Sequence, residues 1–149
     1  MAMRVETSRF GTVETTEDAV LTFPHGLIGF ESMRQWVLVP DPHNPMVAWL
    51  QSVTDPAVAL PTVSPRRLQP DYKASVAERQ LVPLQLRSTD RVYILAVVSK
   101  SGRTLTANLR SPIIINASQR IGCQVVASDD LPLALPLAQS PMRSLRIAA

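Results

Sequence analysis

Side chains that could support catalysis or bind a metal are few in this sequence and lie far apart. There are two histidines, His25 and His43, each next to or near prolines, and a single cysteine, Cys123. Neither histidine has another histidine or a cysteine at the short spacing that tetrahedral zinc sites use, so solvent-exposed turn histidines are favoured over metal ligands. Cys123 lies in an apolar stretch, which favours a buried, inert thiol over a nucleophile.

Two further patterns also lack a catalytic arrangement. Asp129 and Asp130 are adjacent, and adjacent side chains on a strand point to opposite faces, so a loop is favoured over a proton-sharing dyad. The chain has five glycines and contains neither a glycine-rich phosphate loop nor a Gly-x-Ser-x-Gly elbow. Because catalysis needs a positioned acid, base, nucleophile or metal, we expect a protein that is not an enzyme and that uses no cofactor or metal.

The length and composition indicate one small domain rich in turns. The 149 residues suit a single domain spanning 1–149. The 13 prolines exceed the usual share of about 5%, which disfavours long helices. No apolar run approaches the ~20 residues of a membrane helix, and Arg4, Glu6 and Arg9 argue against a secretory signal. The lone cysteine fits a reducing compartment, so we expect a cytoplasmic protein, monomeric on its own.

Charge is distributed unevenly along the chain. Residues 1–60 hold three Arg against seven Asp or Glu, a net charge of −4, whereas residues 61–149 hold twelve Lys or Arg against five Asp or Glu, a net charge of +7. Such asymmetry is typical of a protein whose two faces meet different partners, although ordinary solvated surfaces would explain it equally well.

The basic part also admits an alternative function, a small β-barrel that binds RNA. Single-stranded nucleic acid is held by basic side chains interleaved with stacking aromatic rings. All phenylalanines and tryptophans lie in the acidic part, and the basic part has only Tyr72 and Tyr93. We expect Tyr93 to lie in a core strand. Protein binding is therefore favoured, with no direct contact to nucleic acid.

Hydrophobic periodicity predicts an all-β fold of about ten short strands. Alternation predicts strands around residues 5–7, 13–15 and 104–110, and apolar runs predict strands at 19–23, 36–39, 47–51, 57–63, 113–115 and 121–127. Pro61 suggests an edge or a bulge. The continuous apolar run from Val92 to Val98 is typical of a central strand covered on both faces. These elements favour a closed or nearly closed antiparallel barrel or sandwich.

Helices are expected to be minimal. Residues 75–81 could form one or two helical turns with Ser75 as the N-cap and Glu78 three residues later. Beyond Leu131 the alternating leucines and prolines predict an extended arm, followed by a loose C-terminal tail over about residues 138–149.

Three segments, in this order, resemble the FliW family. The first resembles the family's Phe-Pro-x-Gly-Leu-x-Gly-Phe-Glu and reads Phe23-Pro24-His25-Gly26-Leu27-Ile28-Gly29-Phe30-Glu31. The second combines Leu50-Gln51-Ser52 with a later Pro70-Asp71-Tyr72. The third begins at Val92-Tyr93-Ile94 and contains Thr106-Ala107-Asn108-Leu109-Arg110-Ser111-Pro112-Ile113-Ile114-Ile115-Asn116.

This resemblance implies a β pseudo-barrel of two packed antiparallel sheets and a switch between two partners. Proteins of this family bind flagellin before its export. They also bind CsrA, a small RNA-binding protein that represses flagellin translation. Free FliW-like protein would keep CsrA off its message, and accumulated flagellin would take the FliW-like protein away.

On this resemblance we place the partner-binding site around residues 70–72 and the strand break at residues 108–116. Pro112 limits strand pairing, which can leave a sheet edge free. The amides of Asn108 and Asn116 could instead satisfy backbone groups that the break releases. The expected partner-binding residues are Gln51, Asp71, Tyr72, Asn108, Pro112 and Asn116.

Overall fold

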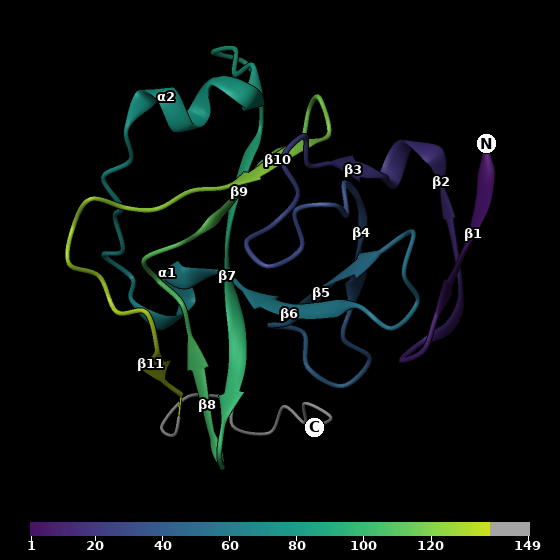
Figure 1. Ribbon diagram of the computed structural model, residues 1–149, viewed down its shortest axis with the longest axis horizontal. Coiled ribbons are helices and arrows are strands. Elements are labelled where there is room, and N and C mark those ends of the chain that lie inside the picture. Colours follow the sequence, from purple (N-terminus) through teal and green to yellow (C-terminus); the bar gives the residue numbers. More distant parts are fainter. Residues whose placement is uncertain (138–149) are drawn as a thin grey trace.

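Short strands around a closed ring dominate the computed structural model, which describes residues 1–137 (Figure 1). The strands are β1 Ala2–Thr7, β2 Gly11–Thr16, β3 Leu21–Thr22, β4 Gln35–Pro40, β5 Ala48–Ser52, β6 Ala59–Val63, β7 Val92–Ser101, β8 Thr104–Ala107, β9 Ile113–Asn116, β10 Ile121–Gln124 and β11 Leu135–Pro136. Helical structure is limited to α1 Pro65–Leu68, α2 Glu78–Leu81 and the 3₁₀ turns Glu17–Ala19 and Val82–Leu84. In the described part, no helix is long and apolar enough to cross a membrane.

The ring has the strand order β7-β6-β5-β4-β3-β10-β9 and closes where β9 pairs with β7. Every pairing in it is antiparallel except the contact between β3 and β10, where Thr22 lies opposite Ile121 in a parallel arrangement. Strands β8 and β11 extend the sheet beyond β7, and β1 and β2 form a separate hairpin. The predicted all-β pseudo-barrel is confirmed.

The ten-residue strand β7 is covered on both faces along its middle. Ile94, Ala96 and Val98 pack into one apolar cluster with Trp49. Leu95 and Val97 pack into a second cluster with Phe23, Leu50 and Ile113. The prediction of a doubly covered strand therefore holds for this stretch. It is wrong for Val92 and Tyr93, which are 43% and 50% exposed.

The hairpin is attached to the ring through Trp49. Phe10 packs edge-on against the Trp49 ring, with their centroids 5.8 Å apart, and the Arg9 guanidinium lies 4.3 Å above the same ring. The indole Nε1 of Trp49 donates to Asp41 Oδ1 at 2.8 Å. Burial opposes ionisation of Asp41, but this bond and the backbone N–H groups of His43 and Asn44 outweigh it and lower its pKa. The contacts of Trp49 thus join the hairpin to β4 and β5.

The loop over residues 23–31 closes one end of the barrel. Phe23 and Leu27 are buried in the second cluster, and Leu27 forms an isolated bridge with Phe30. Gly26 has φ +64°, and a Cβ there would lie 2.4 Å from the backbone oxygen of Phe30. Only glycine combines this φ with such close approach of two backbone segments.

Several local predictions need correction. The third strand begins at Leu21 because residues 17–19 form a 3₁₀ turn. The helix α2 begins at Glu78, so Ala77 and not Ser75 occupies its N-cap position, and the Ser75 N–H donates to Asp129 Oδ1 at 2.7 Å. The four-residue helix α1 was not expected. The predicted extended arm is present where β11 pairs with β8, and the predicted tail over 138–149 lies outside the described residues.

We expect Gly26→Ala to destabilise the protein more than Gly29→Ala. Both glycines have positive φ, but a Cβ at Gly29 meets nothing within 4 Å. Both variants should bear the ~1–2 kcal/mol cost of a left-handed non-glycine residue, and Gly26→Ala should add about 1–3 kcal/mol from overpacking. Urea denaturation measures the difference, and equal midpoints with equal slopes would contradict the proposed backbone clash.

Candidate partner-binding site

The chain turns sharply between β8 and β9, at residues 108–112. The side chain of Asn108 holds this turn, because its Oδ1 accepts the backbone N–H groups of Arg110 at 3.0 Å and Ser111 at 2.9 Å. An asparagine oxygen that accepts from the backbone two and three residues later is a recurrent way to stabilise a turn. Asn108 therefore satisfies the local backbone, which is one of the two roles that the sequence left open.

Tyr72 reaches this turn from the loop after α1. Its hydroxyl donates to the backbone oxygen of Leu109 at 2.8 Å, and the side chain is buried. Burial, together with the negative charge of Asp129, raises the pKa of Tyr72, so the phenol keeps the proton it donates. Asp71, the preceding residue, is exposed. The structure thus brings Tyr72 together with the break while leaving the Asp71 side chain accessible.

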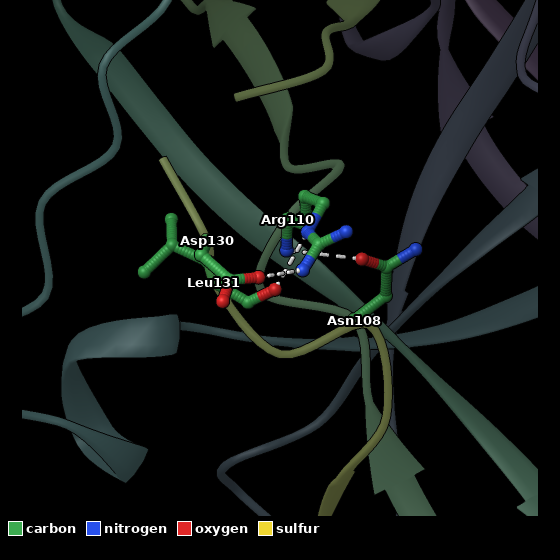
Figure 2. Close-up of polar contacts among 4 residues, drawn as sticks. All are labelled: Asn108, Arg110, Asp130 and Leu131. Atoms are coloured by element: carbon green, nitrogen blue, oxygen red, sulfur yellow. Dashed lines mark hydrogen bonds and ion pairs between the residues drawn. The ribbon is translucent and has the colours of Figure 1, made fainter. Parts of the chain in front are cut away.

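A strap formed by residues 124–132 covers the outer side of the break. Arg110 donates through Nε to the backbone oxygen of Leu131 at 2.7 Å and through Nη2 to Asp130 (Figure 2). The backbone N–H of Leu109 donates to the oxygen of Pro132, and that of Val125 donates to the oxygen of Pro112. The sheet edge that we expected to be free at Pro112 is therefore occupied.

The two adjacent aspartates have separate structural roles. Asp130 pairs with Arg110, and Asp129 accepts the Ser75 N–H. That backbone donor lowers the pKa of Asp129. Since each carboxylate has its own partner, the loop interpretation is supported over a proton-sharing pair.

A groove of about 290 Å³ opens where the chain leaves β6 for α1. Its lining is Ser64, Pro65, Arg66, Tyr72, Val92, Tyr93, Ile94 and Leu95. Half-exposed Tyr93 gives the groove an aromatic wall. Exposed Arg67, Lys73 and Arg91 adjoin lining residues in the chain, and exposed Asp71 adjoins Tyr72. The lining is therefore mostly apolar with one basic residue, Arg66, and the exposed charged residues next to it in the chain, here called the rim, are mainly basic.

Two of the predicted site residues lie elsewhere and are buried. Gln51 on β5 directs Nε2 at the backbone oxygens of the β5–β6 loop, the nearest being Ser52 at 3.0 Å and Val58 at 3.1 Å. Asn116 on β9 donates through Nδ2 to the oxygen of Leu84 and to Asp90, each at 2.9 Å. Pro112 is also buried. Any contribution of these residues to a partner would act through the backbone they hold.

The residues with potential catalytic chemistry form no reactive arrangement. His25 and Cys123 line one cleft of about 360 Å³ beside α2. Cys123 is only 8% exposed, and burial raises the pKa of its thiol to about 11, so it is protonated near neutral pH and is a poor nucleophile. Within residues 1–137, no three His, Cys, Asp or Glu side chains gather as metal ligands.

Comparison with known proteins identifies the relatives of this architecture. The model of the FliW protein family matches residues 4–137. The chain belongs to the FliW family. It is 38% identical to the flagellar assembly factor FliW of Bdellovibrio bacteriovorus over 130 residues, which cover 86% of this chain and 74% of that protein. It is 36% identical to the flagellar assembly factor FliW of Syntrophus aciditrophicus over 130 residues, which cover 85% of this chain and 82% of that protein.

A crystal structure of the flagellar assembly factor FliW has the same fold. It superposes with a TM-score of 0.83 at 27% identity, covering 91% of this chain and 96% of the other. FliW proteins are assembly factors and not an enzyme family. The prediction that this protein is not an enzyme is therefore confirmed by its family membership.

We expect Tyr72→Phe to loosen the contact between the α1 loop and the strand break. The substitution leaves the buried Leu109 oxygen without the hydroxyl donor, which should lower the free energy of unfolding by about 1–2 kcal/mol. Thermal unfolding followed by circular dichroism measures this loss. Tyr93→Phe is the matched control, since the exposed Tyr93 should lose almost nothing. Equal losses of unfolding free energy in the two variants would show that the Tyr72 hydroxyl contributes no more to stability than the exposed Tyr93 hydroxyl.

Proposed function

We propose that this protein is a cytoplasmic flagellar assembly factor that binds flagellin and the translational regulator CsrA. In this role it keeps CsrA from repressing translation of flagellin mRNA. Accumulated flagellin then displaces CsrA from this protein, and repression resumes. The family match over residues 4–137 carries the proposal.

The groove beside Tyr93 is the surface best suited to a flagellin segment. It offers exposed apolar side chains within a charged rim, and such rims give orientation while the apolar interior gives affinity. Asp71 stands at its border, and Tyr72 and Asn108 fix the backbone around it. The predicted site residues at 71, 72 and 108 would thus shape the groove or border it.

The hairpin is the surface best suited to CsrA, which carries a basic RNA-binding surface. Glu6, Glu14, Glu17 and Asp18 are all exposed on the hairpin and the 3₁₀ turn that follows. Arg4 pairs with Glu14 at 3.7 Å, and Arg120 pairs with Asp18 at 2.9 Å. Residues 2–19 still carry a net charge of −2, with Arg4 and Arg9 against the four acids. Complementary charge would mainly raise the association rate.

One observation favours the alternative of RNA binding. Tyr93, which we expected inside the core, is half-exposed in the groove that Arg66 also lines. Single-stranded nucleic acid is usually held by several stacking rings in succession. Tyr72, the other aromatic residue of the groove, is buried and engages Leu109. One exposed ring gives weaker support than the family match. A pull-down from native cytosol that recovers bulk RNA without flagellin or CsrA would reverse this order.

Flagellin should release CsrA from a preformed complex with this protein. If binding of one partner lowers affinity for the other, linkage requires the reciprocal effect by the same factor. The measurement is a fluorescence titration of flagellin into the complex with labelled CsrA. A stable ternary complex with unchanged affinities would leave the protein a flagellin-binding factor and remove the translational role.

Charge reversal on the hairpin should slow CsrA association. Glu14→Lys combined with Glu17→Lys should lower the rate constant severalfold at low salt, with little effect on flagellin, because exposed charges steer encounter. Stopped-flow mixing at increasing salt measures it. Glu78→Lys on α2 is the control for a single charge reversal at a distant exposed position. A rate indifferent to both salt and hairpin charge would place the CsrA surface elsewhere.

A further inference from the structure

Strand β7 has a second edge that is only partly occupied. On one side it pairs with β8 through Val98–Ser101 and with β9 through Val92–Leu95. On the other side it pairs with β6 only at Ala96 and Val97. The chain then leaves the sheet, because Pro65 begins α1. Continuing the β6 register would place Pro65 opposite Ile94, and proline has no N–H to donate.

The direction of the backbone groups along this edge follows from the pairing with β9. The Ala117 N–H donates to the Arg91 oxygen at 2.8 Å, so Arg91, Tyr93 and Leu95 direct their N–H and C=O groups toward β9. Residues alternate in an antiparallel strand, so Val92 and Ile94 direct theirs to the opposite edge. Among residues 1–137, no backbone or side-chain hydrogen bond to these groups is present.

This open edge forms one wall of the groove described above. Val92 and Tyr93 are exposed there, and Pro65, Arg66 and Tyr72 line the remainder. Arg66 is exposed in the lining, and Arg67, Lys73 and Arg91 are exposed next to lining residues in the chain, as is the single acid Asp71. None of these four basic residues forms an ion pair with another described residue. Unpaired strand edges accept further strands, and a basic rim selects acidic ones.

We propose that the edge of β7 at Val92 and Ile94 receives an extended, acidic segment of a protein partner as an added strand. Main-chain hydrogen bonds to these two residues supply the attachment, and the arginines of the rim supply the selectivity for charge. A helical segment would leave both edge groups unpaired, so the extended form is favoured. The inference rests on the proposed function in that it describes how the groove holds a partner.

Amide hydrogen exchange of the free protein tests the edge itself. The amides of Tyr93 and Leu95, bonded to β9, should exchange at least about tenfold more slowly than those of Val92 and Ile94. Nuclear magnetic resonance resolves the four rates within one strand. Equal protection of all four amides would show that the edge is already occupied and would overturn the proposal.

Peptide binding tests the occupant. The probe is an acetylated, amidated heptapeptide in which glutamate and valine alternate, and it should slow exchange at Val92 and Ile94. The same peptide with lysine in place of glutamate, or with N-methylated valines, should give no protection, because the first reverses the charge and the second removes alternate donors. Absence of protection by the acidic peptide at millimolar concentration would overturn the proposal.

Two variants separate the backbone and charge contributions. Val92→Pro removes an N–H that faces away from β9 and should weaken peptide binding roughly fivefold, with a melting curve confirming that the variant folds. Arg66→Glu should weaken it roughly two- to fivefold, while the control Arg103→Glu, in the turn between β7 and β8, should not. Unchanged affinity in both groove variants would overturn the proposal. If the peptide does not bind but flagellin and CsrA do, the strand-addition proposal fails and the proposed function stands. If the peptide binds but flagellin and CsrA do not, only the proposed function is refuted.

Discussion

Closure of the ring depends on one constraint. Strands β8 and β9 pair with the same side of β7 but in different registers, and the chain between them must absorb the difference. Paired positions on β7 and β8 run from Val98 with Ala107, whereas those on β7 and β9 resume at Leu95 with Ile113. The path from Ala107 to Ile113 therefore contains three more residues than the matching path along β7. Asn108, Tyr72 and Arg110 hold that excess as a fixed turn. After this turn, β9 pairs with both β7 and β10.

The same constraint explains where polar side chains are buried. Tyr72 satisfies a carbonyl of the break, Asn116 ties β9 to the turn that follows α2, and Gln51 holds the loop between β5 and β6. Tyr72 and Asn116 contact the main chain of segments far away in the sequence, and Gln51 contacts the main chain of the tight loop that follows its strand. Buried polar groups that engage backbone carbonyls fix one arrangement of loops over a barrel whose apolar clusters would tolerate several. These residues therefore fix the loops that surround the barrel, and Tyr72 does so beside the proposed groove.

Alternation and apolar runs were sufficient to predict the all-β barrel and the doubly covered middle of β7. They could not predict ring closure, because the register shift at residues 108–112 depends on hydrogen bonds to distant segments. The strap over Pro112 was missed for the same reason. Helix α1 is four residues long and begins with proline, too short for any periodicity to emerge. The exposure of Val92 and Tyr93 could not be predicted from the apolar run. It arises because the neighbouring chain leaves the sheet at Pro65, which depends on the tertiary structure.

The attachment of the hairpin has a consequence for optical measurement. Trp49 is buried, bonded to Asp41, faced by Phe10 and covered by the Arg9 guanidinium. Trp36, the other tryptophan, is buried in the second cluster and donates to the oxygen of Met33 instead. Indole emission responds to nearby charge and to water, so displacement of the hairpin tip would alter the spectrum of one tryptophan and leave the other unchanged. The protein thus contains an intrinsic fluorophore at the junction of its two sheets, with a second as an internal reference.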